Sequence, residues 1–286
     1  MTKKKTEEKK AAPKRTAVKK TAKKPTVELK KEIELSAEQV HTVPQPSYKI
    51  STQEHPAVLL VGDEIATSEF TTILSEHGCT VLAEHTSEAL KRSAKNISMV
   101  FEFSNLSIET KKNRLIALDT ALPANIIIIS SSHTVSVLEQ AQWIRHKERL
   151  VGMSALPTLL SNPLIELASS LYTHNAAFSA SEKFFSTLKK ETAIVQDRIG
   201  MVMPRILCQI INEAFFAMQS DVALPKDIDV AMKKGTNYPH GPIEWGEKIG
   251  FQQVVATLEA IYNDTREERN RVCPLLRKIA LAGKFW

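Results

Sequence analysis

The 286-residue sequence predicts an α/β fold, in which a doubly wound parallel sheet follows a disordered basic tail and precedes an all-α domain. Three observations support this prediction: short continuous apolar runs alternate with helical patterns in the middle of the chain, helical patterns alone follow, and lysine dominates the beginning. The expected segments are a tail and linker over 1–55, an α/β domain over 56–195 and a helical domain over 196–286.

The net positive charge of the chain comes from residues 1–31. Residues 1–31 hold thirteen basic and three acidic side chains, whereas residues 32–286 hold 25 basic and 29 acidic ones. Because Lys, Ala, Thr and Pro offer little apolar surface to offset the entropy of ordering, we expect this segment to be disordered. Such a tail attracts polyanions, nucleic acid among them, by counterion release. The alternative is a solubilising extension, since no aromatic residue is interleaved to stack bases.

Two function classes are excluded by composition. No apolar run approaches the roughly 20 residues that a membrane helix needs, so we expect no membrane span. The three cysteines, Cys79, Cys208 and Cys273, lie in unrelated segments without metal-ligand spacing. We therefore expect neither a disulfide nor a metal site, and a reducing, cytoplasmic location.

The α/β part opens with a strand, a turn and a helix. The apolar run 57–61 ends at Gly62, and the next apolar residues have helical spacing until Gly78. Further strands are expected at 80–82, 98–103, 125–129, 150–153 and 164–167. Continuous apolar strands of this kind are typical of a parallel sheet that is covered on both faces.

The first turn is where a doubly wound fold binds a dinucleotide, through the pattern G-x-G-x-x-G at the start of a helix. Here Gly62 alone matches, because Glu64 and Thr67 stand at the second and third glycine positions. Asp63 and Glu64 bring negative charge to the place of the phosphates, and like charges repel more strongly as water is excluded. The alternative is structural: both acids cap the helix that they begin.

The C-terminal part is helical. Residues 199–218 place most of their apolar side chains on one face, and a second helix begins near Asp227 and is expected to end at Gly235. Pro239 and Pro242 then fix a turn. Three aromatic residues near this turn are interpreted as core residues, or alternatively as acyl contacts: Tyr238, Trp245 and Phe251.

The stretch Gly235-Thr236-Asn237-Tyr238-Pro239-His240-Gly241-Pro242-Ile243-Glu244-Trp245 resembles the signature of the C-terminal domain of 3-hydroxyacyl-CoA dehydrogenases, especially those that act on short or adipyl-type thioesters. The resemblance extends from about residue 57 to 283. It implies a Rossmann-like NAD-binding domain, NAD as cofactor, acyl-CoA as ligand and a homodimer formed through 196–286. His85, preceded by Glu84, stands where the family's ribose-binding acid would be.

The resemblance also implies four catalytic positions, of which three are altered. Ser154 stands at the position of the family's histidine base, His133 at that of a serine, and Pro204 at that of an asparagine, whereas Glu166 retains the acid that orients the base. A serine hydroxyl cannot accept a proton near neutral pH as imidazole can. One hypothesis is that His133 and Glu166 form a displaced base dyad; the alternative is that His133 is a polar loop residue.

Three functions follow as alternatives. The first is a family member that keeps the scaffold, the dimer and acyl-CoA affinity but has lost or weakened hydride transfer. The second is a working NAD-dependent 3-hydroxyacyl-CoA dehydrogenase of fatty-acid or aromatic-acid catabolism. The third is an interaction protein that binds polyanions through residues 1–31.

Overall fold

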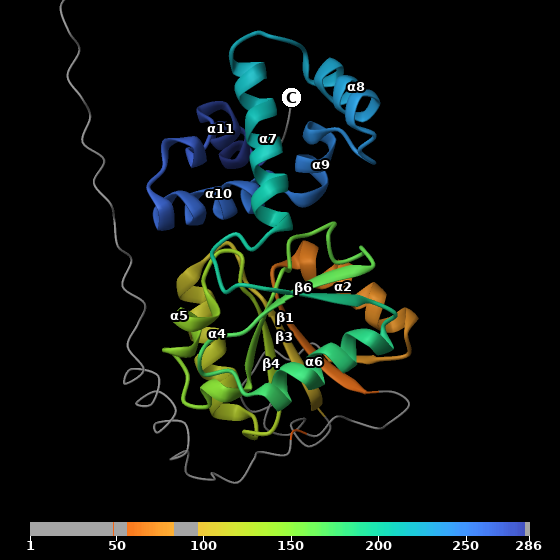
Figure 1. Ribbon diagram of the computed structural model, residues 1–286, viewed down its shortest axis with the longest axis vertical. Coiled ribbons are helices and arrows are strands. Elements are labelled where there is room, and N and C mark those ends of the chain that lie inside the picture. The colour runs from red at the N-terminus through yellow and green to blue at the C-terminus, as the bar shows by residue number, and fades with distance from the viewer. Residues whose placement is uncertain (1–47, 49–55, 83–96, 284–286) are drawn as a thin grey trace, which may run out of the picture. The chain divides into compact units, whose positions relative to one another are not determined.

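Within the residues that the computed structural model describes, which are 48, 56–82 and 97–283, seven strands form one sheet (Figure 1). In chain order they are β1 (Ala57–Gly62), β2 (Thr80–Leu82), β3 (Ile97–Phe103), β4 (Ile127–Ser131), β5 (Leu150–Met153), β6 (Leu164–Ala168) and β7 (Glu191–Val195). Their order across the sheet is β2-β1-β3-β4-β5-β6-β7, and helices connect most of them. The predicted Rossmann-like α/β fold is confirmed.

One pair of neighbouring strands departs from the predicted parallel sheet. β5 and β6 run antiparallel and pair Gly152 with Ala168, whereas every other neighbouring pair is parallel. A parallel neighbour needs a crossover connection of about a dozen residues or more. Residues 154–163 connect these two strands through turns without a helix, so the chain reverses its direction.

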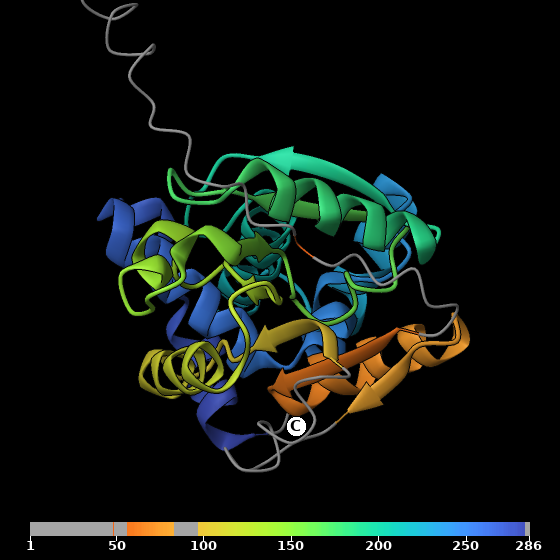
Figure 2. The ribbon, with the colours of Figure 1, turned by 90° about the horizontal axis from the view of Figure 1, so that it is seen from below.

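Helices cover both faces of the sheet. They are α2 (Glu64–Glu76), α4 (Ile108–Ala121), α5 (Val137–Ala141) and α6 (Asn175–Thr187), with a short 3-10 turn, η1 (Lys147–Arg149), before β5. α2 and α6 pack on one face, and α4 and α5 on the other (Figure 2). Because helices cover both faces, the ends of the strands are the places where the sheet is open to a ligand.

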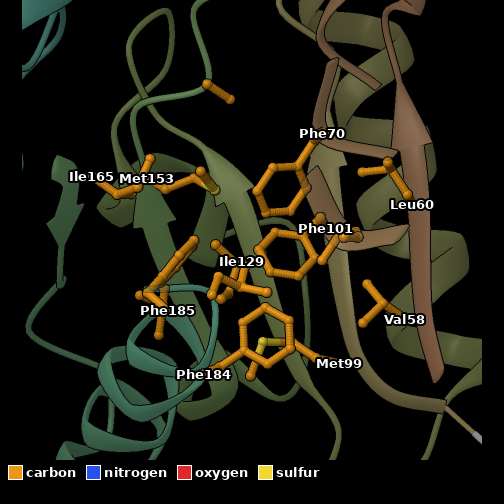
Figure 3. Close-up of a cluster of buried hydrophobic side chains, with 14 of the residues drawn as sticks. Val58, Leu60, Phe70, Met99, Phe101, Ile129, Met153, Ile165, Phe184 and Phe185 are labelled. Carbon is orange, nitrogen blue, oxygen red and sulfur yellow. The ribbon is translucent and has the colours of Figure 1, made fainter. Parts of the chain in front are cut away.

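Aromatic rings fill the space between the sheet, α2 and α6 (Figure 3). The ring centroid of Phe70, on α2, lies 4.8 Å from that of Phe101, on β3, and Phe184, on α6, lies 5.5 Å from Phe101 on another side. Edge-to-face and tilted pairs of this kind add to the free energy gained by burial. The contacts hold α2, and with it the turn that precedes α2, in a fixed position against β1 and β3.

The C-terminal part is helical throughout its described length. Its elements are α7 (Met203–Gln219), α8 (Pro225–Thr236), α9 (Pro242–Ile249), α10 (Phe251–Thr265), η2 (Glu268–Asn270) and α11 (Pro274–Ala282). α7 lies among α9, α10 and α11 (Figure 1) and buries Leu207, Ile211 and Phe215 against them. The predicted helix starts later than expected, because Val202 is the N-cap of α7 and is 45% exposed.

The helical part and the sheet belong to one compact unit, residues 46–286. Leu156 and Leu159, from the connection between β5 and β6, are buried in the same apolar cluster as α7, α9, α10 and α11. Trp245, on α9, donates from Nε1 to Oγ1 of Thr158 over 2.9 Å. Gln253, near the N-terminus of α10, bonds to Asp63 at the carboxyl end of β1, so α10 begins beside the ends of the strands.

The stretch between α8 and α9 is fixed by a single carboxylate. Asp229 accepts hydrogen bonds from the backbone N–H groups of Ile243 (2.8 Å) and Glu244 (3.0 Å), which are free donors at the start of α9. A Cβ atom at Gly241 would collide with the Asp229 side chain, so only glycine fits there. Gly235 does not end α8, since the helix runs to Thr236 and Asn237 caps it in the left-handed conformation, with φ of 58°.

Some expectations lie outside the described residues. These are the disordered tail and linker (1–55, apart from Tyr48), the polyanion contact of 1–31, and His85 with Glu84. Tyr48 packs against the apolar cluster beneath α2 and α6. In the described part of the chain, every helix is too short or too polar to cross a bilayer.

Candidate functional site

The turn after β1 is built around a glycine. Gly62 has a φ of +144°, and a Cβ atom there would lie 2.6 Å from the backbone carbon of Phe103. Both facts require glycine, because L side chains rarely adopt this φ and the neighbouring strand end leaves no room. The turn therefore keeps the first glycine of the Rossmann pattern. α2 begins two residues later, at Glu64.

Asp63 is the N-cap of α2, but its side chain does not cap that helix. Its Oδ2 accepts instead from the backbone N–H groups of Asn105 (2.7 Å) and Leu106 (3.2 Å) and from Nε2 of Gln253 (2.9 Å). For this residue the capping interpretation is therefore wrong: the carboxylate faces the end of β3 and the N-terminus of α10, where three donors converge. Glu64, in the first turn of α2, is exposed.

A chain of buried polar groups continues from this carboxylate along the strand ends. Ser131, the last residue of β4, donates from Oγ to Oδ1 of Asn105 over 2.5 Å, and its Oγ lies 3.0 Å from Nδ1 of His133. The other ring nitrogen of His133, Nε2, is buried and has no hydrogen-bond partner.

Burial and a nearby positive charge keep His133 neutral. Burial, with a further contribution from the nearby positive charge of Lys111, lowers the pKa of His133 to about 3. Lys111 is itself buried; burial lowers its pKa, and its partner Glu102 opposes that shift. Nζ of Lys111 donates to Oε2 of Glu102, which also accepts from the Ser130 hydroxyl over 3.0 Å. At neutral pH the edge therefore carries a neutral imidazole beside a buried ion pair.

Ser154 and Glu166 lie together, as the resemblance implies, but their side chains share no hydrogen bond. A cavity of about 100 Å³ is lined by both residues and by Met203. The hydroxyl of Ser154 is buried without a partner. The carboxylate of Glu166 accepts from the backbone N–H groups of Val202 (3.0 Å) and Met203 (2.7 Å), so it caps the N-terminus of α7.

The structure does not bring His133 and Glu166 into one dyad. Nδ1 of His133 bonds to Ser131, and its Nε2 has no partner. The Glu166 carboxylate bonds to the first amides of α7. Pro204 is buried in the first turn of α7, where a missing N–H costs nothing because that donor is free in any helix. The dyad hydrogen bond is therefore absent from the described structure.

A larger cavity, of about 580 Å³, opens at the first turn. One wall comes from the turn and the end of β3, and the other from α9, α10 and α11. Its lining residues include Asp63, Glu64, Leu106, Glu247 and Gln253. The volume is within the range of small-molecule sites, and the place is the crevice where open α/β sheets bind ligands.

The residues at this turn do not fit the diphosphate of a dinucleotide. The first amides of α2 have no side-chain cap, but a diphosphate that approached them would meet the carboxylates of Asp63 and Glu64. The amides of Asn105 and Leu106, which could hold an anion at the strand end, already bond to Asp63. In the described residues, no cluster of His, Cys, Asp and Glu could hold a metal ion that would compensate this charge.

Three members of the site are not predicted from the sequence: Asn105, Ser131 and Gln253. A signal exists for the first two, because each lies at the carboxyl end of an apolar strand and neighbouring parallel strands end at one edge of the sheet. No local signal identifies Gln253, which is 190 residues from its partner Asp63.

Comparisons with known proteins agree with the fold. Residues 67–198 match the sequence model described as "3-hydroxyacyl-CoA dehydrogenase, NAD binding domain", and residues 200–286 match the model of the C-terminal domain. Together these matches cover more than half of the chain. NAD is the cofactor of this family.

Individual relatives support the same assignment. A 3-hydroxybutyryl-CoA dehydrogenase from Bradyrhizobium diazoefficiens is 29% identical over 185 residues, which are 65% of this chain and 63% of the relative. A 3-hydroxyadipyl-CoA dehydrogenase from Escherichia coli is 31% identical over 63% of this chain and 35% of its own length. The matches thus span less than two thirds of either relative.

Solved structures agree in fold. An (S)-3-hydroxybutyryl-CoA dehydrogenase from Ralstonia eutropha has a TM-score of 0.63 at 22% identity, covering 80% of this chain and 94% of that one. FadB2 of M. tuberculosis has a TM-score of 0.66 at 17% identity with the same coverages. Taken with the two domain matches, the chain belongs to the 3-hydroxyacyl-CoA dehydrogenase family.

Proposed function

We propose that this chain is a family member that has lost, or greatly weakened, NAD-dependent hydride transfer and that acts as an acyl-CoA-binding scaffold. The observation that carries the proposal is the position of the Asp63 carboxylate, which bonds to the end of β3 and to Gln253 of α10. A carboxylate held there opposes a diphosphate by its charge, and it also occupies the strand-end amides of Asn105 and Leu106.

The acid–base residues support the same conclusion. The serine at position 154 cannot replace imidazole as a proton acceptor near neutral pH. The retained Glu166 caps the start of α7, and its carboxylate forms no hydrogen bond with the side chain of Ser154 or His133, so it orients no base among these residues. A neutral, buried His133 with a pKa of about 3 is a weak base for abstracting a hydroxyl proton.

We further propose a homodimer formed through residues 196–286, with acyl-CoA as the ligand that the scaffold retains. Support comes from α8, an amphipathic helix with no buried residue, whose Val230 is 47% exposed. The preceding loop exposes Val222 and Leu224 as well. Exposed apolar residues on a helix and on the loop before it are candidates for a protein interface. The acyl-CoA assignment is supported by similarity to a 3-hydroxybutyryl-CoA and a 3-hydroxyadipyl-CoA dehydrogenase.

The catalytic part of the proposal is tested by acetoacetyl-CoA reduction with NADH at high protein concentration. We expect no turnover above the rate without protein. The working-dehydrogenase alternative predicts a measurable rate that is lost in Glu166→Gln and kept in a matched exposed variant, Glu213→Gln, and this result would defeat the proposal. A titration with acetyl-CoA in the same samples tests the retained ligand, and the absence of binding would remove that part.

The dimer is tested by sedimentation equilibrium. We expect a dimer for the intact chain and dissociation in Val230→Glu, because a charge would enter the apolar face of α8. Leu281→Glu, which changes a still more exposed leucine on α11, is the matched control and should leave the dimer intact. A monomeric intact chain would contradict the dimer.

The polyanion alternative has a separate test, which is DNA binding by the intact chain. Binding that is lost on removal of residues 1–31 would favour that alternative.

A further inference from the structure

A turn between β6 and α6 exposes two large apolar side chains. Leu171 is 75% exposed, and its neighbour Tyr172 is 40% exposed. Hydrogen bonds fix the turn: the backbone N–H of Ser170 donates to Oγ1 of Thr173 over 3.0 Å, and that of Tyr172 donates to Oγ of Ser170 over 3.2 Å. Thr173 in turn donates from Oγ1 to the carbonyl oxygen of Leu150, at the start of β5. The two exposed side chains are therefore carried by a turn that is bonded to the sheet.

Positive charge lies beside this turn. Nζ of Lys147 is 4.7 Å from the ring centroid of Tyr172. Arg145, on the same connection between α5 and β5, is exposed. One acid, Glu148, also belongs to this connection, and its charge acts on Tyr48. An ammonium group over an aromatic ring places positive charge and apolar surface side by side at one point of the surface.

The basic segment 1–31 joins the described part of the chain close to the same turn. The ring centroid of Tyr48, the first described residue, lies 6.1 Å from that of His174, which directly follows the turn. Residues 1–31 hold thirteen basic and three acidic side chains. The covalent chain therefore keeps a large net positive charge within reach of Leu171 and Tyr172.

These features fit an anionic lipid surface better than a protein or a nucleic acid. Two apolar side chains cover far too little area for a stable protein interface, which buries about 800 Å² on each partner. Nucleic acid offers phosphates to the basic segment, but residues 1–31 contain no aromatic residue to stack on bases, and an exposed leucine gains nothing from phosphates. A lipid surface combines negative headgroups with an apolar interior. A basic segment together with a few inserted side chains is sufficient to bind it.

We propose that the protein docks on an anionic lipid bilayer through this turn and the basic segment. Residues 1–31 supply the electrostatic attraction, and Leu171 inserts among the acyl chains next to the headgroups. Tyr172 lies at the level of the headgroups, where a ring with a hydroxyl group is favoured, and Lys147 beside it meets the lipid phosphates. Docking requires neither hydride transfer nor acyl-CoA, so it is independent of the proposed function.

Sedimentation of the intact chain with lipid vesicles tests this proposal. One set of vesicles is pure phosphatidylcholine, and the other contains about 30% phosphatidylserine. We expect binding to the anionic set alone, and at least tenfold weaker binding when the ionic strength rises from about 0.1 M to about 1 M, because the Debye length falls from about 10 Å to about 3 Å. Removal of residues 1–31 should abolish the binding. No binding to anionic vesicles, equal binding to both sets, or unchanged binding without residues 1–31 would overturn the proposal.

Variants of the turn separate insertion from attraction by charge alone. Leu171→Ser/Tyr172→Ser should weaken vesicle binding at least tenfold, since the apolar area that leaves water on docking is lost. Leu281→Ser, which changes an 82% exposed leucine on α11, is the matched control and should have no effect. Leu171→Trp should bind at least as tightly as the wild type, because tryptophan is favoured at the level of the headgroups. Unchanged vesicle binding by the double variant would also overturn the proposal.

Duplex DNA, tested with the same samples, distinguishes the two kinds of polyanion. The double variant of the turn should bind DNA as the wild type does, because only the charge of residues 1–31 takes part. Wild-type binding to DNA without binding to vesicles, or an equal loss of both in the double variant, would overturn the lipid assignment. Turnover of acetoacetyl-CoA by a chain that binds vesicles as expected would contradict the proposed function and leave lipid docking intact.

Discussion

Replacement of Asp63 by alanine should destabilise the folded chain much more than the same change at the neighbouring Glu64. In the wild type, Oδ2 of Asp63 accepts from Asn105 (2.7 Å), Leu106 (3.2 Å) and Gln253 (2.9 Å). The Leu106 amide is exposed and can bond to water after the substitution. The Asn105 amide and the Gln253 side chain belong to buried residues and would lose their acceptor.

The magnitude follows from these two shielded bonds. Hydrogen bonds to a charged acceptor contribute about 1.5–3 kcal/mol each, and at the lower end of that range two of them give about 3 kcal/mol. For a folded unit of this size, each 1 kcal/mol shifts Tm by about 2–4 °C, so we expect Asp63→Ala to melt about 9 °C lower. Glu64→Ala, which removes an exposed carboxylate, should stay within about 0.5 kcal/mol of the wild type.

Urea denaturation and thermal melting measure both variants. A double-mutant cycle with Gln253→Ala should show a coupling of about 1 kcal/mol between residues 63 and 253. If Asp63→Ala and Glu64→Ala were equally stable, the carboxylate would not hold the turn and α10 together, and the reasoning about the diphosphate position would fail with it.

Three further predictions concern the glycine turn, the cap of α7 and the buried imidazole. Gly62→Ala should lower the free energy of unfolding by about 3 kcal/mol, since its Cβ meets Phe103. Gly235→Ala, with open space around it, should raise that energy by about 0.5 kcal/mol. Equal effects of the two variants would contradict the close packing of Gly62 against Phe103. Glu166→Ala should cost about 2 kcal/mol in urea denaturation through loss of the α7 cap, and an unchanged midpoint would show that the cap contributes nothing. Since the pKa of His133 is lowered in the folded state from 6.5 to about 3, its contribution to stability is complete above pH 6.5 and is lost as pH falls toward 3. At pH 5 this loss is about 2 kcal/mol, so His133→Asn should show a flatter pH profile of unfolding than the wild type; parallel profiles would contradict the assigned pKa.

The parts of the fold that sequence predicts are those in which local pattern and tertiary environment agree. The runs 57–61 and 125–129 are apolar throughout because both faces of their strands are covered. β7 is not predicted, because Glu191-Thr192-Ala193-Ile194-Val195 lies at the sheet edge and buries little of its surface. The direction of β6 depends on the connection that precedes it, which forms turns rather than a crossover helix although it contains buried leucines.

The site is predicted in position but not in its bonds. The acidic turn and the altered base position are visible as residues that replace an expected glycine and histidine. The partners of Asp63 and Glu166 are not visible, because each carboxylate bonds to a backbone amide or side chain far along the chain. A carboxylate selects donors by geometry, which sequence spacing does not encode.

The central claim is that Asp63 and its donors occupy the position of the NAD diphosphate. Equilibrium titration of the intact chain with NADH, followed by nicotinamide fluorescence, tests it most directly. The account predicts no saturable change in the fluorescence. A saturable change in fluorescence that NAD displaces would contradict it.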